Sequence, residues 1–248
     1  MQDTKNPALP QKFAVEDQRY LESRSRLSKK YGERELWSVI DHWPLYAGIG
    51  NLSRYLANYE LLKSTLDVPG DIVEFGSWRG ANLMLFAKTL KILDPHCGKV
   101  VHCFDSFEGL TQFVKEDGAA KDLAGKYRGS LEELKDMIEL CQLKDDVVFH
   151  KGYVEETLPV FTKSNPAQSF SFVYIDTDLY ESTRTILNEL HPRLCKGGVF
   201  VFDEWNSGIY PGEGMAANEF LKAHGACYEV KHVRNARQPN LVLQKIAY

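Results

Sequence analysis

Carboxylates follow two apolar runs of the sequence, at the point where each run ends. The run FSFVYI stops on Asp176 and Asp178, and a later run, VFVF, stops on Asp203 and Glu204. Carboxylates that lie close together repel one another unless a cation lies between them. Oxygen ligands suit hard cations, so Asp176, Asp203 and Glu204 are predicted to bind Mg²⁺, with Mn²⁺ or Ca²⁺ as competitors. The alternative is that Asp176 caps the next helix and the second pair lies in a solvated loop.

A glycine turn precedes these acids in the segment VEFGSWRGAN. Gly76 comes directly after an apolar run and Gly80 stands at the start of a predicted helix. Glycine there lets the backbone approach a ligand, and the helix N-terminus offers free N–H donors. The spacing is not G-x-G-x-x-G, so the dinucleotide-binding fingerprint is absent. A tight strand-to-helix turn without a ligand remains the alternative.

Two further segments have residues suited to binding a nucleoside. Asp105 ends the run VHCF, where an acid can accept hydrogen bonds from both ribose hydroxyls. Its alternative role is to cap a helix, as Asp and Ser often do. In the segment FHKGYVEETLP, Gly152 and Tyr153 are predicted to lie near the adenine, with Tyr153 stacking on the ring or else packing in the core.

Strands that alternate with helices are predicted to position these residues. Apolar segments at 71–76, 99–105, 146–152, 170–176 and 199–205 alternate with helical patterns, and two last strands are expected at 227–233 and 240–247. Residues 195–198 (CKGG) are expected to form a turn. Such alternation favours a mainly parallel sheet covered on both faces, with the last pair as an antiparallel edge. Ligands bind beyond the carboxyl ends of parallel strands, so the acids should gather at one edge.

Composition narrows the class of protein. The chain has 248 residues, 44% hydrophobic, which suits one large domain, and its net charge of −4 argues against nucleic acid as a partner. No apolar run is long enough to cross a bilayer, and the N-terminus lacks the pattern of a secretory signal. The five cysteines are scattered without a CxxC pair, so a cytoplasmic protein without structural zinc is expected.

Five motifs in this order, VEFGSWRG, FDSFEGL, GYVEETLP, IDTDLYEST and LCKGGVFVFDEWN, resemble the macrocin-O-methyltransferase family over residues 45–225 or so. The resemblance implies an α/β fold of the Rossmann-like class I methyltransferase type, with a mainly parallel seven-stranded sheet. It also implies S-adenosylmethionine as methyl donor, Mg²⁺ beside the acceptor, and a sugar or natural-product hydroxyl as the acceptor.

Carried over by position, Asp176 resembles the family's metal ligand and catalytic base. Asp203 and Glu204 match a pair that is usually Asp-Asp, so Glu204 keeps an oxygen ligand on a longer side chain. Residues 206–220 differ from the family's usual continuation and are expected to line a different acceptor pocket. The expected contacts to S-adenosylmethionine are Glu74, Gly76, Ser77, Asp105, Ser106, Gly152, Tyr153 and Asp176.

The chain is predicted to divide into a helical cap or lid, residues 1–66, and a cofactor-binding core, residues 67–248. The cap would cover the acceptor or form a homo-oligomer interface. His42 is a second candidate base because it lies in the aromatic segment DHWPLY, although an ordinary structural histidine is the simpler interpretation. Three alternatives stay open: a metal-independent methyltransferase, a nicotinamide-dependent oxidoreductase, and a binding protein without catalysis.

Overall fold

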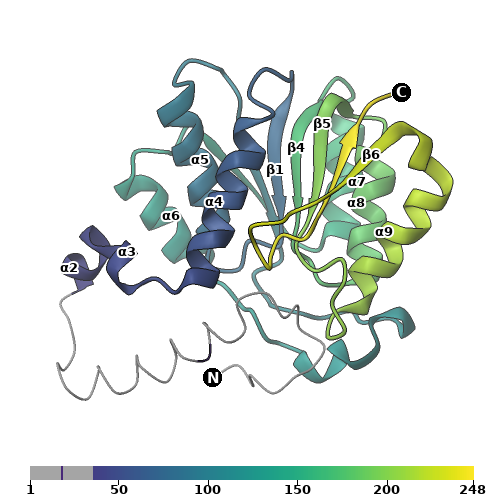
Figure 1. Ribbon diagram of the computed structural model, residues 1–248, viewed down its shortest axis with the longest axis horizontal. Helices are drawn as coiled ribbons and strands as arrows, with labels where there is room; N and C mark the ends of the chain where they lie inside the picture. The colour runs from purple at the N-terminus through teal and green to yellow at the C-terminus, as the bar shows by residue number, and fades with distance from the viewer. Residues whose placement is uncertain (1–17, 19–35) are drawn as a thin grey trace.

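The computed structural model describes Gln18 and residues 36–248, and a seven-stranded sheet forms its centre (Figure 1). The strand order is β3-β2-β1-β4-β5-β7-β6. The first five strands in the chain pair in parallel, and β7 pairs antiparallel with both β5 and β6. The predicted sheet with its antiparallel edge is thus confirmed. The strands are β1 (Asp71–Phe75), β2 (Val101–Asp105), β3 (Val147–Lys151), β4 (Phe170–Ile175), β5 (Leu194–Phe202), β6 (Tyr228–His232) and β7 (Leu241–Lys245).

Helices cover both faces of the sheet (Figure 1). On one face, α4, α5 and α6 bury side chains such as Leu62 and Phe86. On the other, α7, α8 and α9 bury Leu158, Ile186 and Phe220. The described helices are α2 (Leu36–Asp41), α3 (Trp43–Tyr46), α4 (Ile49–Lys63), α5 (Ala81–Leu93), η1 (Lys115–Leu123), α6 (Leu131–Leu140), α7 (Val154–Ser164), α8 (Tyr180–Leu190), α9 (Pro211–His224) and η2 (Gly225–Cys227).

The central strand β4 is mostly apolar because both of its faces are covered. All six of its residues are buried. Phe172 and Tyr174 pack with the α4–α6 layer, whereas Val173 and Ile175 pack with the α7–α9 layer. A strand covered on both faces has no solvent side and therefore loses the alternation of apolar and polar residues. The same burial makes the carboxylate that follows at Asp176 the first polar side chain beyond a dry strand.

One local prediction was wrong, and one helix was not predicted at all. Residues 195–198 do not separate a helix from a strand, because β5 begins at Leu194. Its pairing with β4 shifts register between Phe170 and Phe172, and Gly197 has a φ of +88°, so the glycines form a bulge inside the strand. Helix α7 was not anticipated, since Pro159 lies within it.

Most of the predicted cap lies outside the described residues, because residues 1–17 and 19–35 are not described. Its last helix, α4, packs on α5. Asn58 donates a hydrogen bond of 3.1 Å to Asn82, and Leu62 is buried among core side chains. This helix is therefore anchored to the core. No helix in the described part of the chain is both long and apolar enough to cross a membrane.

Candidate active site

A cavity opens where the strand order reverses, between β1 and β4. Its empty space, open mouth included, is about 1030 Å³. Such a reversal point is where open α/β sheets bind ligands. Of the predicted site residues, those that line it are Gly76, Asp105, Ser106, Gly152, Tyr153, Asp176, Asp203 and Glu204.

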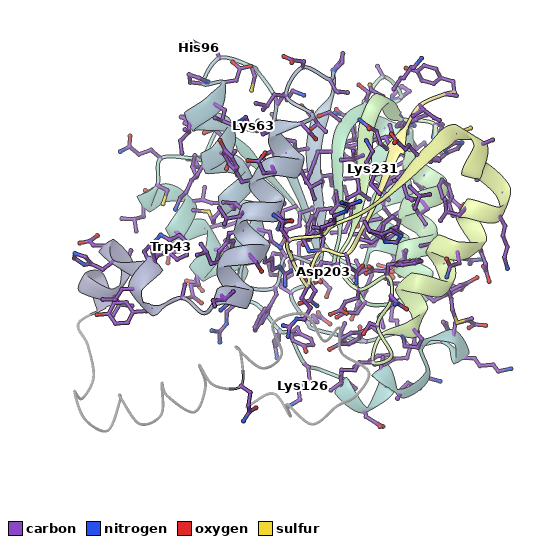
Figure 2. All side chains as sticks on the ribbon, in the orientation of Figure 1. Trp43, Lys63, His96, Lys126, Asp203 and Lys231 are labelled. Carbon is purple, nitrogen blue, oxygen red and sulfur yellow. The ribbon has the colours of Figure 1, made fainter. Side chains whose placement is uncertain are left out.

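Three predicted site residues do not line this cavity: Glu74, Ser77 and His42. Glu74 is buried beneath the β1–α5 turn and accepts a hydrogen bond of 2.6 Å from Oγ of Ser77. Burial raises the pKa of Glu74 to about 8. His42 is exposed where α3 begins, and its neighbour Trp43 lies at the periphery in Figure 2, far across the view from Asp203.

Asp105 joins the turn after β1 to the turn after β2. Its Oδ2 accepts hydrogen bonds from the backbone N–H groups of Ser77 (2.7 Å) and Trp78 (2.9 Å), and its Oδ1 accepts one from Phe107 (2.6 Å). Burial raises the pKa of the Asp105 carboxyl, and these three bonds oppose the shift. A carboxylate offers about four acceptor positions, so one remains for a ligand hydroxyl. Turn support and ligand binding are compatible at this residue.

The acids after β4 and β5 meet a cation that the sequence did not reveal. Nη2 of Arg54, from α4, lies 2.8 Å from Oδ2 of Asp176 and 3.0 Å from Oδ1 of Asp203. The hydroxyl of Tyr174 donates a hydrogen bond of 2.5 Å to the same Oδ1 of Asp203. One guanidinium thus bridges Asp176 and Asp203. Asp203 is also fixed by its hydrogen bond from Tyr174 of β4.

Glu204 lies beside this pair and is only partly satisfied. Gln238 donates to its Oε1, while its Oε2 is buried without a hydrogen-bond partner. Its backbone N–H donates to Oε1 of Glu213 (2.8 Å), whose Oε2 is also buried and unpartnered. Burial first, and then the charge of Asp203, raises the pKa of Glu204 to about 8, and the same causes do so for Asp176. The single guanidinium of Arg54 therefore does not balance the negative charge that Asp176, Asp203 and Glu204 can carry.

The chemistry of this donor set fits the predicted Mg²⁺, although its arrangement is not that of a closed metal site. The acids supply hard oxygen ligands, and the unpartnered oxygen of Glu204 is one that a cation would satisfy. Within the described residues, however, no group of three His, Cys, Asp or Glu side chains is placed to hold a metal ion. Arg54 lies between two of the acids instead.

Sequence reasoning missed Arg54, Gln238 and the wall formed by Tyr127 and Tyr210. The hydroxyls of the two tyrosines are 2.8 Å apart, and both residues line the cavity. A signal for Arg54 was present, because it is the one basic residue in the stretch from residue 49 to 62. Nothing in the sequence linked it to Asp176, which lies 122 positions further along the chain.

Known proteins resemble the chain in sequence and in fold. Residues 3–237 match the macrocin-O-methyltransferase (TylF) family. Demethyldecarbamoylnovobiocin O-methyltransferase of Streptomyces niveus is 35% identical over 147 residues, which are 56% of this chain and 54% of the relative. The matched part thus spans about half the length of that curated relative.

Solved structures extend the comparison. The calicheamicin methyltransferase CalS11 superposes with a TM-score of 0.79 at 25% identity over 91% of each chain, and its apo structure is described as a TDP-rhamnose 3'-O-methyltransferase. The O-methyltransferase TomG of Streptomyces achromogenes, solved with S-adenosylmethionine, shares the fold with a TM-score of 0.56 at 12% identity, over 94% of this chain and 99% of its own. Because the family match spans residues 3–237, the chain belongs to the macrocin-O-methyltransferase (TylF) family.

Proposed function

We propose that the protein transfers a methyl group from S-adenosylmethionine to a hydroxyl of a sugar or natural-product acceptor. The observation that carries the proposal is one cavity shared by the glycine turns after β1 and β3, the Asp105 carboxylate, and the Asp176–Asp203 pair. The named activities of the Streptomyces niveus relative and of CalS11 support the class of acceptor.

The cofactor half of the cavity fits a nucleoside. Gly76 and Gly152 bring bare backbone to its lining, Asp105 offers an acceptor for a ribose hydroxyl, and Tyr153 offers a ring for stacking. The hydroxyl of Tyr153 donates to Oε2 of Glu108 (2.9 Å), which fixes the ring's orientation. S-adenosylmethionine, when bound, supplies a methyl group activated on a sulfonium.

Asp176 is placed to take the proton of the acceptor hydroxyl. In the absence of a metal ion, Arg54 engages Oδ2 of Asp176, and Oδ1 is left to accept the proton. In the metal-free site, burial and then the charge of Asp203 raise the pKa of Asp176 to about 8, which makes it a stronger base there than an exposed carboxylate. Asp176, Asp203 and Glu204 would hold Mg²⁺, which would stabilise the negative charge that develops on the acceptor oxygen.

Other side chains that line the cavity suit a sugar. Trp78, Tyr127 and Tyr210 supply aromatic surface, and Gln112 and Gln238 supply amide groups. Aromatic rings pack on the apolar faces of sugars while amides bond their hydroxyls. Tyr210 precedes α9 in the segment that departs from the family's usual sequence, so it is proposed to help determine which acceptor is used.

Ligand binding followed by turnover tests the proposal. S-adenosylhomocysteine at 100 times its dissociation constant should add about 2.7 kcal/mol to the free energy of unfolding, read as a rise in Tm, while NAD⁺ should add nothing. Transfer of a labelled methyl group is then screened on deoxysugar nucleotides, glycosylated macrolides and catechols. A rise in Tm with NAD⁺ but not with S-adenosylhomocysteine would contradict the proposal.

A further inference from the structure

The Asp176–Asp203 pair already holds a cation, the guanidinium of Arg54. One atom, Nη2, contacts both carboxylates, at 2.8 and 3.0 Å. It lies between them, where a metal ion shared by the two acids would also have to lie. We propose that Arg54 is a displaceable counter-cation, which fills the carboxylate pair in the absence of a divalent ion and leaves when one binds.

The guanidinium and a divalent ion compete for the same oxygens. Tyr174 and Arg54 both bond Oδ1 of Asp203, and an oxygen with two such partners has no lone pair left for a third. Mg²⁺ requires oxygen ligands at about 2.0–2.1 Å, and a second cation at contact distance from it would be strongly repelled. Binding of the metal ion through these oxygens therefore requires that Arg54 moves away.

The surrounding acids show that Arg54 alone is an incomplete partner. Glu204 is 4% exposed, and its Oε2 is buried without a partner. Glu213, fully buried behind it, also keeps an unpartnered Oε2. Buried, unpartnered carboxylate oxygens are costly, so the cluster has capacity for more positive charge than one guanidinium supplies. A doubly charged ion matches that deficit better.

Displacement requires only a side-chain rotation. The backbone of α4 is anchored by the Asn58–Asn82 hydrogen bond and by Ala57 and Leu62, which are 2% and 1% exposed. The side chain of Arg54 is 27% exposed and lines the open cavity, so part of it already contacts solvent. The switch therefore lies in the rotamer of Arg54 and leaves the helix in place.

Binding of Mn²⁺ to the full chain, stripped of metal, tests the inference without any turnover. Titration calorimetry and the electron paramagnetic resonance signal of free Mn²⁺ would be compared for wild type, Arg54→Gln and Arg54→Lys. If Arg54 leaves the pair open about a tenth of the time, Arg54→Gln should bind Mn²⁺ about tenfold more tightly. Arg54→Lys keeps a charge without the planar fork and should lie between the two.

Arg184→Gln is the matched control. Arg184 pairs with Glu181 at 2.5 Å on α8, is about half exposed, and does not line the cavity, so its loss should leave Mn²⁺ affinity unchanged. Equal or weaker Mn²⁺ binding by Arg54→Gln, or binding by neither protein, overturns the inference. If Arg54→Gln does not fold, Arg54→Lys decides, and affinity equal to that of wild type overturns it.

The inference rests on the proposed metal-assisted methyl transfer, and a parallel titration with S-adenosylhomocysteine separates the two failures. If wild type binds S-adenosylhomocysteine and the Arg54 substitutions do not change the affinity for Mn²⁺, only the role of Arg54 is overturned. Wild type that does not bind S-adenosylhomocysteine contradicts the proposed function itself.

Discussion

Gly76 and Asp176 lie in direct backbone contact across the point where the strand order reverses. A Cβ placed on Gly76 would stand 2.0 Å from the carbonyl oxygen of Asp176, and Gly76 has a φ of +81°. The backbone N–H of Asp176 donates a 2.9 Å hydrogen bond to the carbonyl of Phe75. The glycine turn and Asp176, the proposed base, are therefore one unit, in which the missing side chain at Gly76 sets the position of Asp176.

Gly76→Ala should lower both stability and cofactor binding. The positive φ alone costs about 1–2 kcal/mol with a side chain, and a clash with backbone adds more because backbone cannot rotate away. Gly98→Ala separates the cost of the positive φ from the cost of the clash. Gly98 has a φ of +66°, and nothing lies within 4 Å of the added Cβ. Urea denaturation should show a larger loss for Gly76→Ala than for Gly98→Ala. Equal losses would mean that the close approach to Asp176 is relieved at no cost.

Tyr174→Phe should destabilise the fold through Asp203. Tyr174 is fully buried and donates to a carboxylate that is itself 1% exposed, and hydrogen bonds to charged groups contribute about 1.5–3 kcal/mol. Tyr228→Phe is the control, because the hydroxyl of Tyr228 bonds the imidazole of His191 at 2.7 Å and should contribute about 0.5–1.5 kcal/mol. A Tyr174→Phe protein as stable as Tyr228→Phe would contradict this prediction.

Glu74 should make the protein less stable as pH rises. Its pKa is raised from 4.5 to about 8, chiefly by burial, so between these values the folded state binds a proton that the unfolded state has released. The free energy of unfolding contributed by this group then falls with pH, by at most about 1.4 kcal/mol per pH unit. Glu74→Gln should remove that part of the slope in denaturation curves at pH 6, 7 and 8. Glu139→Gln, at an exposed position of α6, should keep the wild-type slope, and an unchanged slope in Glu74→Gln would refute the prediction.

The sheet could be predicted because its signals are local and repeated. Each parallel strand is a short apolar run, and acids that follow such runs must gather at one edge when the strands are parallel. That reasoning placed Asp105, Asp176 and Asp203 at one cavity correctly. It failed where local signals conflict, as in α7, which contains Pro159, and in β5, where glycines form a bulge instead of a turn.

The partners of the acids could not be predicted, because they come from distant parts of the chain. Arg54 reaches Asp176 from 122 residues away, and Gln238 reaches Glu204 from 34 residues away. A helix pattern identifies the buried face of α4 without saying which carboxylate lies opposite each residue. Glu74 shows the opposite case, because it was predicted to contact a ligand but does not line the cavity. Its position near the end of β1 suggested a ligand contact, but its side chain lies beneath the β1–α5 turn and accepts a hydrogen bond from Ser77.

Asp176→Asn is the decisive substitution for the chemistry. An amide keeps the shape and an oxygen that can still accept from Arg54, but it cannot take a proton. Loss of a general base lowers the rate by about 10²–10⁴-fold, so kcat should fall by that factor while S-adenosylhomocysteine affinity stays within a few-fold. Asp146→Asn is the control, because Asp146 pairs with Lys91 at 2.9 Å and does not line the cavity. A kcat that survives in Asp176→Asn would leave this residue neither base nor essential ligand. The proton would then have to go to another group in the cavity, and Asp178, which is buried and lines the cavity, would be the next to replace.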